Sequence, residues 1–293
     1  MSQDDPDRHD FATPQLAASV MADGAELCML RNGAALDYLW PAAPAWPRHA
    51  PVLFPIVGRL ADDTLNHEGK SYRLPQHGFA RDRRFTWVER SATGCVLRLE
   101  DDAETQAMYP FRFRFEVRYA VTDATLEITY TVINTGDVVL PASMGAHPAF
   151  RWPLDPNRTK EDYALTFDRD ETAPMRGVAG GLLTAADRPS PIVGGHLALT
   201  DDLFTADALV LPNPASRSVR LAAADGPALT VSWDGFDQLG IWSRPGADFL
   251  CIEPWCGMAS PADFTGEFIR KPWLMLIPPG ESRAAIHRMT VEA

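Results

Sequence analysis

The sequence predicts an all-β protein built from large antiparallel sheets with few short helices. Three observations lead to this prediction: a long segment of alternating apolar and charged residues, many short apolar runs between Gly, Pro and Asp clusters, and scarce helical periodicity in a chain with 25 prolines. Alternation with a period of two is typical of half-buried strands, and scattered prolines disfavour long helices. Together these features indicate a many-stranded sandwich.

The clearest predicted element is a β-hairpin in the first half of the chain. Apolar residues occupy every second position from Phe111 to Val121, with mostly charged residues between them. The segment Thr122 to Ala124 interrupts this pattern, which resumes from Leu126 to Val132 before the turn residues Asn134 to Gly136. Two alternating runs with so short a break between them predict antiparallel neighbours in a sheet.

Further strands are expected where short apolar or alternating runs lie between turn residues. These runs are Phe85 to Val88, Cys95 to Leu99, Val219 to Leu221, Leu229 to Trp233, Leu239 to Trp242, Phe249 to Ile252 and Leu274 to Ile277. One helical turn is expected from Ala103 to Met108, because Pro110 prevents its continuation. The Pro-rich segment from Ala42 to Pro51 and the Gly-rich segment from Arg176 to Gly195 are predicted to be loops.

We expect a single domain over residues 11–293, because 293 residues fit one large β-sandwich and no linker-like segment divides the chain. Residues 1–10 are polar and acidic, and we expect them to be disordered. They lack the basic and apolar regions of a signal peptide, and no run of about 18 apolar residues follows. These features predict a cytoplasmic protein.

The charge balance limits the expected partners. The formal net charge of −12 argues against nucleic acids and anionic membrane surfaces, because both bind basic faces. A small molecule is therefore the expected partner, while the oligomeric state is not predicted. Four cysteines in so long a chain do not suggest a disulfide framework, and Cys251 and Cys256 are not spaced like zinc ligands.

Polar residues with catalytic potential gather in three segments rich in Gly and Pro, where a rigid β scaffold usually presents function. The first segment has two parts, residues 54–59 and 76–82, and includes Arg59, His77 and Arg81; the second, residues 144–150, includes His147; the third, residues 251–257, includes Glu253 and Trp255. The segments are far apart in sequence, so a shared site would require the fold to bring them together.

Each of these residues also has a structural interpretation. The two histidines could be hydrogen-bonded loop residues, and the two arginines could form surface ion pairs with nearby aspartates. Trp255 could fill the core or pack on the apolar face of a sugar ring. Glu253 follows three apolar residues, and a buried carboxylate needs partners or a raised pKa.

Other familiar chemistries have no support in the sequence. We find no G-x-S-x-G elbow, P-loop, H-E-x-x-H motif or dinucleotide fingerprint. Among the marked residues we find no pair of metal ligands two or four positions apart. We therefore expect neither a metal nor another cofactor.

Taken together, the segments resemble the aldose 1-epimerase family, in particular its LacX-like branch. The similarity covers almost the whole chain and lies in Phe54 to Arg59, Leu74 to Asp82, Gly145 to Phe150, Asp202-Leu203-Phe204 with Asp207-Ala208-Leu209, and Ile252 to Gly257. The motifs are specific as a set. The resemblance implies a β-supersandwich of the galactose mutarotase type, a two-sheet antiparallel fold whose concave face holds the sugar.

The resemblance also implies a reaction, the interconversion of the α and β anomers of a hexose. Glu253 would be the general base and His147 the general acid, and we expect only a modest increase in the pKa of Glu253. No metal or redox cofactor is needed. The implied or candidate contacts with the sugar are Arg59, His77, Arg81, Asp202 and Trp255.

Two other functions fit the same motifs. Residues 77–81, His-Gly-Phe-Ala-Arg, also resemble hexose-6-phosphate 1-epimerases. Guanidinium groups suit phosphate oxygens, and the candidate phosphate ligands are Arg59, Arg81, Arg83 and Arg84. The second alternative is a non-catalytic sugar-binding protein on the same fold. A matched acid and base favour an enzyme, because a binding protein needs only partners for the hydroxyls.

Overall fold

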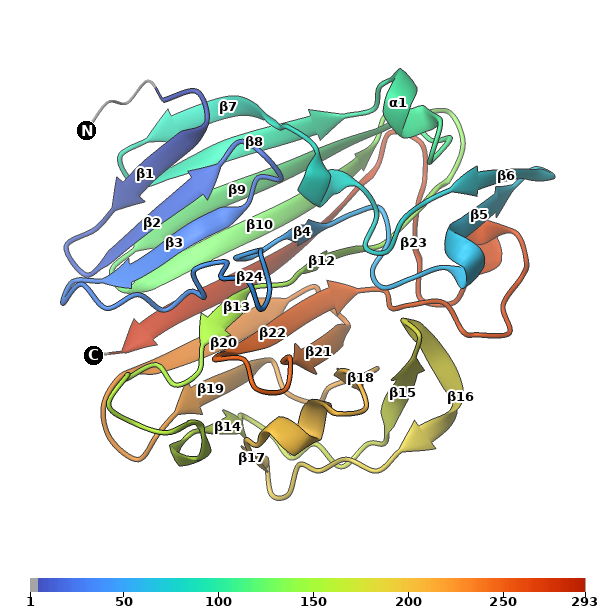
Figure 1. The fold of residues 1–293 in the computed structure, drawn as a ribbon. Coiled ribbons are helices and arrows are strands. Elements are labelled where there is room, and N and C mark those ends of the chain that lie inside the picture. Colours follow the sequence, from blue (N-terminus) through green and yellow to red (C-terminus); the bar gives the residue numbers. More distant parts are fainter. Residues whose placement is uncertain (1–4, 293) are drawn as a thin grey trace.

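The computed structural model describes residues 5–292, and most regular structure in this range is β-strand (Figure 1). Two large antiparallel sheets dominate the molecule, as the alternating sequence pattern predicts. The predicted all-β fold is confirmed. Within the described residues, no helix has the length and apolar character needed to cross a membrane.

The first large sheet has nine strands and contains the predicted hairpin. In sheet order its strands are β17 (His196–Ala198), β14 (Ala164–Phe167), β19 (Ser218–Ala222), β20 (Ala228–Asp234), β24 (Ser282–Glu292), β10 (Thr125–Asn134), β9 (Phe113–Thr122), β8 (Gly94–Glu100) and β7 (Thr86–Ser91). Strands β9 and β10 pair in register from Thr122↔Thr125, which confirms the hairpin. On the polar face of this sheet, Arg98 on β8 forms an ion pair with Glu116 on the neighbouring strand β9.

The second large sheet has eight strands and forms the base of the candidate site. In sheet order they are β16 (Leu182–Arg188), β15 (Met175–Ala179), β18 (Leu209–Leu211), β21 (Gln238–Trp242), β22 (Phe249–Cys256), β12 (Met144–Ala146) and β4 (Val52–Leu53), and β13 (Ala149–Arg151) also pairs with β22. Every residue of β22 is buried. Both faces of this strand are therefore covered, unlike the faces of β10.

Alternate residues of β22 serve different parts of the molecule. Leu250 and Ile252 belong to the main apolar core, to which strands of both large sheets contribute. Trp255 belongs to a smaller apolar cluster. Because successive side chains of a strand point to opposite faces, Glu253 shares the face of Cys251 and Trp255. This alternation places one set of side chains in the core and the other set toward the candidate site.

Shorter elements cover the large sheets. They are β1 (Arg8–Ala12), β2 (Leu16–Met21), β3 (Leu27–Asn32), β5 (Thr64–His67), β6 (Lys70–Arg73), β11 (Leu140–Ala142), β23 (Met275–Ile277), α1 (Ala103–Gln106), and the 3₁₀ turns η1 (Ala61–Asp63), η2 (Ala80–Asp82), η3 (Lys160–Asp162), η4 (Asp201–Phe204) and η5 (Phe268–Arg270). Figure 1 shows β1 to β3 lying across β8, β9 and β10, and contacts of β1 and β2 with these strands agree.

Two local predictions differ from the structure. Residues 8–10, expected to be disordered, lie in β1, which pairs with β2 from Arg8↔Met21; residues 1–4 lie outside the described range. The segment from Arg176 to Gly195, expected to be a loop, instead forms much of the β15–β16 hairpin. Gly180 and Gly181 adopt positive φ at the turn of this hairpin. The glycines that suggested an irregular loop are therefore the residues that allow the tight turn between the two strands.

Candidate active site

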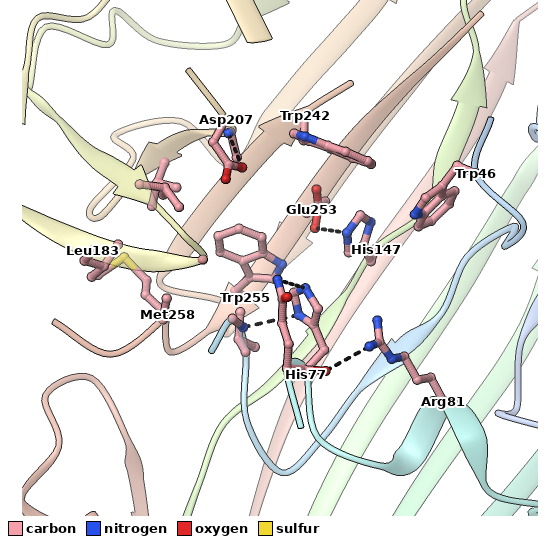
Figure 2. Close-up of a pocket in the computed structure, with 18 residues that line it drawn as sticks. Trp46, His77, Arg81, His147, Leu183, Asp207, Trp242, Glu253, Trp255 and Met258 are labelled. Atoms are coloured by element: carbon pink, nitrogen blue, oxygen red, sulfur yellow. Dashed lines mark hydrogen bonds and ion pairs between the residues drawn. The ribbon is translucent and has the colours of Figure 1, made fainter. Parts of the chain in front are cut away.

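A pocket of about 380 Å³ lies over the eight-stranded sheet. Its lining comes from all three polar segments identified in the sequence, and includes His77, Arg81, His147, Glu253 and Trp255. Figure 2 shows these side chains converging from separate strands and loops. The fold therefore brings together residues as far apart in sequence as His77 and Trp255, and the volume suits a small-molecule ligand.

His147 and Glu253 lie side by side in this pocket. His147 is in the link between β12 and β13, which both pair with the strand that carries Glu253. His147 Nε2 and Glu253 Oε2 are 3.2 Å apart, and the two residues are 8% and 1% exposed. Neither His147 Nδ1 nor Glu253 Oε2 has a well-aligned hydrogen-bond partner among the described residues, so both retain capacity to interact with a ligand.

Burial moves the pKa values of this pair in opposite directions. Loss of solvation, followed by the negative charge of Asp207, raises the pKa of Glu253 well above its usual value. Loss of solvation, followed by the positive charge of Arg81, lowers the pKa of His147. The expected modest shift of Glu253 is therefore wrong, because a carboxylate this deeply buried loses most of its hydration.

Two tryptophans hold the imidazole of His147 in place. The Trp46 ring stacks on it with centroids 5.0 Å apart and an interplanar angle of 27°. Trp242 meets it edge-on at 5.9 Å and 87°. Aromatic contacts of this kind restrict ring rotation, so His147 presents a fixed edge to Glu253.

Trp255 forms the floor of the pocket, and glycines on both neighbouring strands make room for it. A Cβ atom added to Gly145 on β12 would lie 2.6 Å from Trp255 Cδ1. A Cβ atom added to Gly240 on β21 would lie 2.2 Å from Trp255 Cη2. The indole is therefore held across the sheet, with 6% of Trp255 exposed.

His77 and Arg81 also line the pocket, and the His77 ring meets that of His147 edge-on, with centroids 5.5 Å apart and an interplanar angle of 75°. The backbone N–H of Gly58 donates to His77 Nδ1 at 3.2 Å, which leaves Nε2 as the protonated nitrogen of the neutral ring. Burial, followed by the neighbouring His147 and Arg81, lowers the pKa of His77. Arg81 Nη2 donates to the carbonyl of Gln76 at 2.8 Å, while the buried Arg81 Nε makes no hydrogen bond to a described residue and lies 3.7 Å from Asp82 Oδ2.

Two predicted sugar contacts lie elsewhere. The guanidinium of Arg59 forms two hydrogen bonds with Asp63, at 2.6 and 3.0 Å, and Gly58 lines the pocket in its place. Asp202 is exposed in η4 and lines a separate shallow hollow with Met175 and other residues. Neither Arg59 nor Asp202 lines the pocket, so the expectation for these two side chains is corrected.

The pocket also contains residues that the sequence analysis did not propose as sugar contacts. Asp207 stands at the rim, where its positive φ of 71° turns the chain and its Oδ1 accepts from Ala208 N–H at 2.7 Å. Trp46 and Trp242 form an aromatic wall. Asp207 was within a recognised motif, whereas Trp46 lay in a Pro-rich loop that offered no signal of its own.

One group of residues in the pocket region has the composition of a metal site. Ligand atoms of His147, Cys251 and Glu253 lie within 4.8 Å of one another. Cys251 and Glu253 are two positions apart on β22, a ligand spacing that the sequence analysis overlooked. A strand places residues i and i+2 on the same face, so this pair converges on His147.

Comparisons with known proteins agree on one family. The family model for aldose 1-epimerase matches residues 8–275. Protein LacX of Lactococcus lactis subsp. lactis, in its plasmid and chromosomal forms, is 30% identical over 281 residues, which cover 92% of this chain and 94% of LacX.

Solved structures give the same result for the fold. A galactose mutarotase related enzyme from Lactobacillus acidophilus is 31% identical, with a TM-score of 0.90 and coverage of 98% of this chain and 97% of that one. A galactose mutarotase-like protein from Lactobacillus casei ATCC 334 is 28% identical, with a TM-score of 0.91 and coverage of 97% and 100%. The fold is therefore of the galactose mutarotase type.

Proposed function

The chain belongs to the aldose 1-epimerase family, and on this premise we propose that it interconverts the α and β anomers of a hexose by acid and base catalysis. One observation carries the proposal: His147 and Glu253 lie 3.2 Å apart within a pocket large enough for a small ligand. A mutarotase needs a proton acceptor for the C1 hydroxyl and a proton donor for the ring oxygen, and this pair supplies both.

The proposed reaction moves two protons and breaks one ring bond. Glu253 accepts the proton of the C1 hydroxyl while His147 donates a proton to the ring oxygen, so the C1–O5 bond breaks and C1 becomes an aldehyde. Rotation about the C1–C2 bond presents the other face of the aldehyde. Closure re-forms the C1–O5 bond, and both protons return to the groups that held them.

From the reactive state, with Glu253 ionised and His147 protonated, the pKa shifts favour proton transfer in the ring-opening direction, and the same shifts lower the population of that state near pH 7. A raised pKa makes Glu253 a stronger base, and a lowered pKa makes protonated His147 a stronger acid. After transfer, both side chains are neutral, which is the state that burial favours. Each positioned acid or base typically contributes about 10²- to 10⁴-fold to the rate.

The remaining pocket residues suit a sugar. Trp255 offers an apolar surface for one face of a pyranose. We propose that His77 and Asp207 bind hydroxyl groups, since both line the pocket and hydroxyls can donate to a carboxylate and accept from a ring N–H. In this proposal Asp207 takes the part that the sequence analysis gave to Asp202.

A phosphorylated hexose is the second candidate, because Arg81 lines the pocket and its Nε makes no hydrogen bond to a described residue, only a 3.7 Å ion pair with Asp82. The other candidate phosphate ligands are engaged elsewhere: Arg59 with Asp63, Arg83 with Glu104, and Arg84 with Asp7 and Asp23. We favour the free sugar, since one arginine provides less charge for a phosphate than the expected cluster would.

The test follows anomer exchange by saturation-transfer NMR with glucose, galactose and glucose 6-phosphate. We expect wild type to accelerate exchange of a free hexose, and Glu253→Gln to lower that rate by about 10²- to 10⁴-fold while sugar affinity is retained. Glu127→Gln, a control on exposed β10 surface where Glu127 pairs with Arg288, should keep full activity.

The other outcomes separate the alternatives. Acceleration of glucose 6-phosphate alone would replace the free-sugar proposal with the phosphorylated one. Sugar binding without acceleration, before and after Glu253→Gln, would indicate a non-catalytic binding protein. Full activity in Glu253→Gln would contradict the assigned base.

A further inference from the structure

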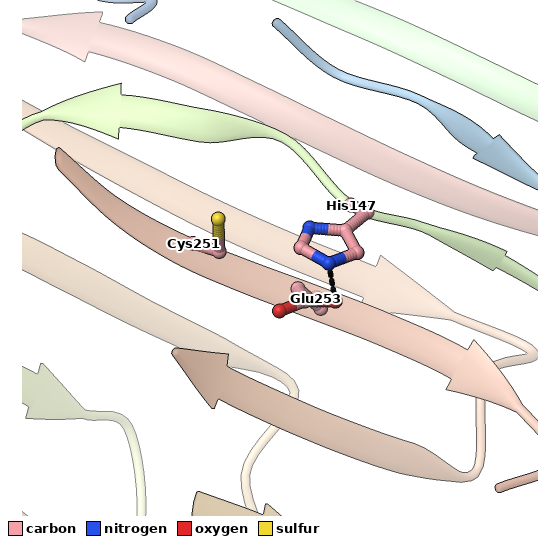
Figure 3. Close-up of side chains that lie close together, drawn as sticks. All are labelled: His147, Cys251 and Glu253. Carbon is pink, nitrogen blue, oxygen red and sulfur yellow. Dashed lines mark ion pairs between the residues drawn. The ribbon is translucent and has the colours of Figure 1, made fainter. Parts of the chain in front are cut away.

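Three different metal-ligand types meet below the pocket. Glu253 and Cys251 project from the same face of β22, and His147 lies above them at the β12–β13 link (Figure 3). All three residues are at least 92% buried, with Cys251 at 0% exposure. Their ligand atoms lie within 4.8 Å of one another.

The measured spacing is close to that of a zinc coordination sphere. With Zn–N and Zn–O bonds of about 2.1 Å at tetrahedral angles, a nitrogen and an oxygen ligand are separated by about 3.4 Å. The His147 Nε2–Glu253 Oε2 distance is 3.2 Å. A Zn–S bond of about 2.3 Å brings sulfur to about 3.6 Å from the other ligands, so Cys251 Sγ needs to move by about 1 Å at most from within the 4.8 Å limit.

A second observation marks the cluster as able to accept a ligand. Glu253 Oε2, the oxygen that faces His147 Nε2, is buried without a well-aligned hydrogen-bond partner among the described residues. Buried polar atoms are usually satisfied, and an uncompensated carboxylate oxygen in an apolar setting attracts a cation. Because the carboxylate and the imidazole line the pocket, an ion has a path to them from solvent.

We propose that His147, Cys251 and Glu253 form an inhibitory site for a thiophilic divalent cation of the zinc and cadmium class. Imidazole, thiolate and carboxylate are all zinc ligands, and a thiolate selects against magnesium and calcium. The cation comes from solution and is not a resident cofactor. Three protein ligands leave a fourth position, which faces the pocket and takes a water molecule.

Binding of the ion requires the loss of protons. Cys251 binds as a thiolate, so its S–H proton leaves to solvent as the metal–sulfur bond forms. Glu253 binds as a carboxylate, and any proton on it also leaves. No electron is transferred, and the cation keeps its oxidation state.

The inhibitory effect rests on the proposed function, whereas binding of the ion does not. A cation bound to Glu253 and His147 occupies the proposed base and the proposed acid at once, so neither can transfer a proton to the sugar. Sugar and cation should therefore exclude each other from the same pocket. Binding and activity are read by separate measurements, so a failure of one proposal is distinguishable from a failure of the other.

The experiment titrates the full-length protein with CdCl₂ and records the ultraviolet thiolate-to-cadmium charge-transfer band, alongside anomer exchange by NMR. We expect wild type to develop the band with one Cd²⁺ per chain and to lose exchange activity in parallel. Cys251→Ala should remove the band and raise the inhibitory Cd²⁺ concentration by about 100-fold. Loss of a group that only hydrogen-bonds to a metal ligand lowers metal affinity by about 10- to 100-fold, and loss of a ligand itself should cost at least as much.

A matched control lies on the same strand. Cys256 is also buried, but its Sγ contacts the carbonyl of Gly235 and its side chain points to the opposite face of β22. Cys256→Ala should keep both the band and the inhibition. If Cys251→Ala does not fold, Cys251→Ser provides a second variant without the thiol. His147→Gln removes another proposed ligand and should also weaken Cd²⁺ binding.

Three results would overturn the proposal. These are a wild-type protein that develops no band, a band that persists in the folded Cys251→Ala or Cys251→Ser variant, and a band that disappears only in Cys256→Ala. If metal-free wild type accelerates no sugar, the proposed function fails, and the charge-transfer titration still decides whether the site binds the ion.

Discussion

Strands β10 and β22 both lie in the interior of the two large sheets, yet they differ in what surrounds them. In β10 buried and partly exposed residues alternate along all ten positions, whereas all eight positions of β22 are buried. A charged residue on β10, such as Glu127, reaches solvent and pairs with Arg288. Glu253 on β22 is buried, so its charge can be stabilised only by neighbouring protein groups or by a bound ligand.

The difference shows where chemistry can be built on this fold. An ion pair at the solvated face of a sheet contributes about 0–1 kcal/mol to stability. A carboxylate in a strand covered on both faces is perturbed by loss of hydration. Perturbed titratable groups in a pocket are typical of functional sites, and Glu253 meets this description.

The largest expected effect separates activity from stability. His147→Gln should lower anomer exchange by about 10²- to 10⁴-fold, because an amide cannot act as the proton donor. The free energy of unfolding should fall by only about 1–3 kcal/mol, because a buried amide replaces the imidazole between Trp46 and Trp242. Exchange NMR and urea unfolding measure the two quantities. A loss of activity that merely follows a loss of folded protein would break the comparison.

The reverse pattern is expected in the nine-stranded sheet. Ile128 on β10 is 2% exposed in the main core, and Ile128→Ala should lower the free energy of unfolding by about 2–5 kcal/mol by leaving a cavity. The turnover of the folded fraction should be unchanged. Chemical denaturation and exchange NMR at matched folded concentration check this result; a specific fall in turnover would show that the two sheets are coupled.

A smaller effect is expected at the floor of the pocket. Gly240→Ala places a methyl group 2.2 Å from Trp255 Cη2, so the indole or β21 must shift, at a cost of about 1–3 kcal/mol. We also expect a higher KM, because the floor moves. In Gly240→Ala/Trp255→Phe the stability loss should be less than additive. Additive losses in denaturation experiments would argue against contact between the two side chains.

The smallest expected effect concerns pH and a buried lysine next to the pocket. Lys271 is 3% exposed and donates to the carbonyl of Met258 at 2.7 Å, and burial lowers its pKa to about 7. The unfolded chain therefore binds the proton more tightly than the folded one, and stability rises with pH above about 7. From pH 7 to 8 the gain should be about 1 kcal/mol.

The difference between wild type and Lys271→Met isolates this contribution from the other titrating groups. We expect the free energy of unfolding of Lys271→Met to rise less between pH 7 and 8 than that of wild type, as measured by urea denaturation at each pH. Equal pH dependence in the two proteins would show that Lys271 is not perturbed by burial.

Sequence patterns predicted the nine-stranded sheet better than the eight-stranded one, for a physical reason. The alternation from Phe111 to Val121 reports a strand with one wet face, and β9 covers Phe113–Thr122. Strand β22 carries no alternation, because both faces are buried, and only its apolar start was predicted. The β15–β16 hairpin was missed, since its Gly-rich composition is also that of a loop.

The site was predicted in composition more fully than in geometry. His147 and Glu253 were identified through motif resemblance, but their 3.2 Å separation depends on the pairing of β12 and β13 with β22. The resemblance implied a sugar contact for Asp202, whereas Asp207, five positions later, lines the pocket, because the turn between them decides which carboxylate faces it. Such a turn depends on tertiary packing, which local sequence patterns do not encode.

The alternation of side chains between the two faces of β22 determines which insertions this strand can accept. Inserting one residue between Phe249 and Glu253 would turn the carboxylate toward the apolar core and an apolar neighbour toward the pocket, provided the remaining register held. Inserting two residues would restore the facing of Glu253 while moving it one step along the sheet. We therefore expect a single-codon insertion within β22 to disrupt the site, whereas the same insertion in a surface loop leaves this alternation intact.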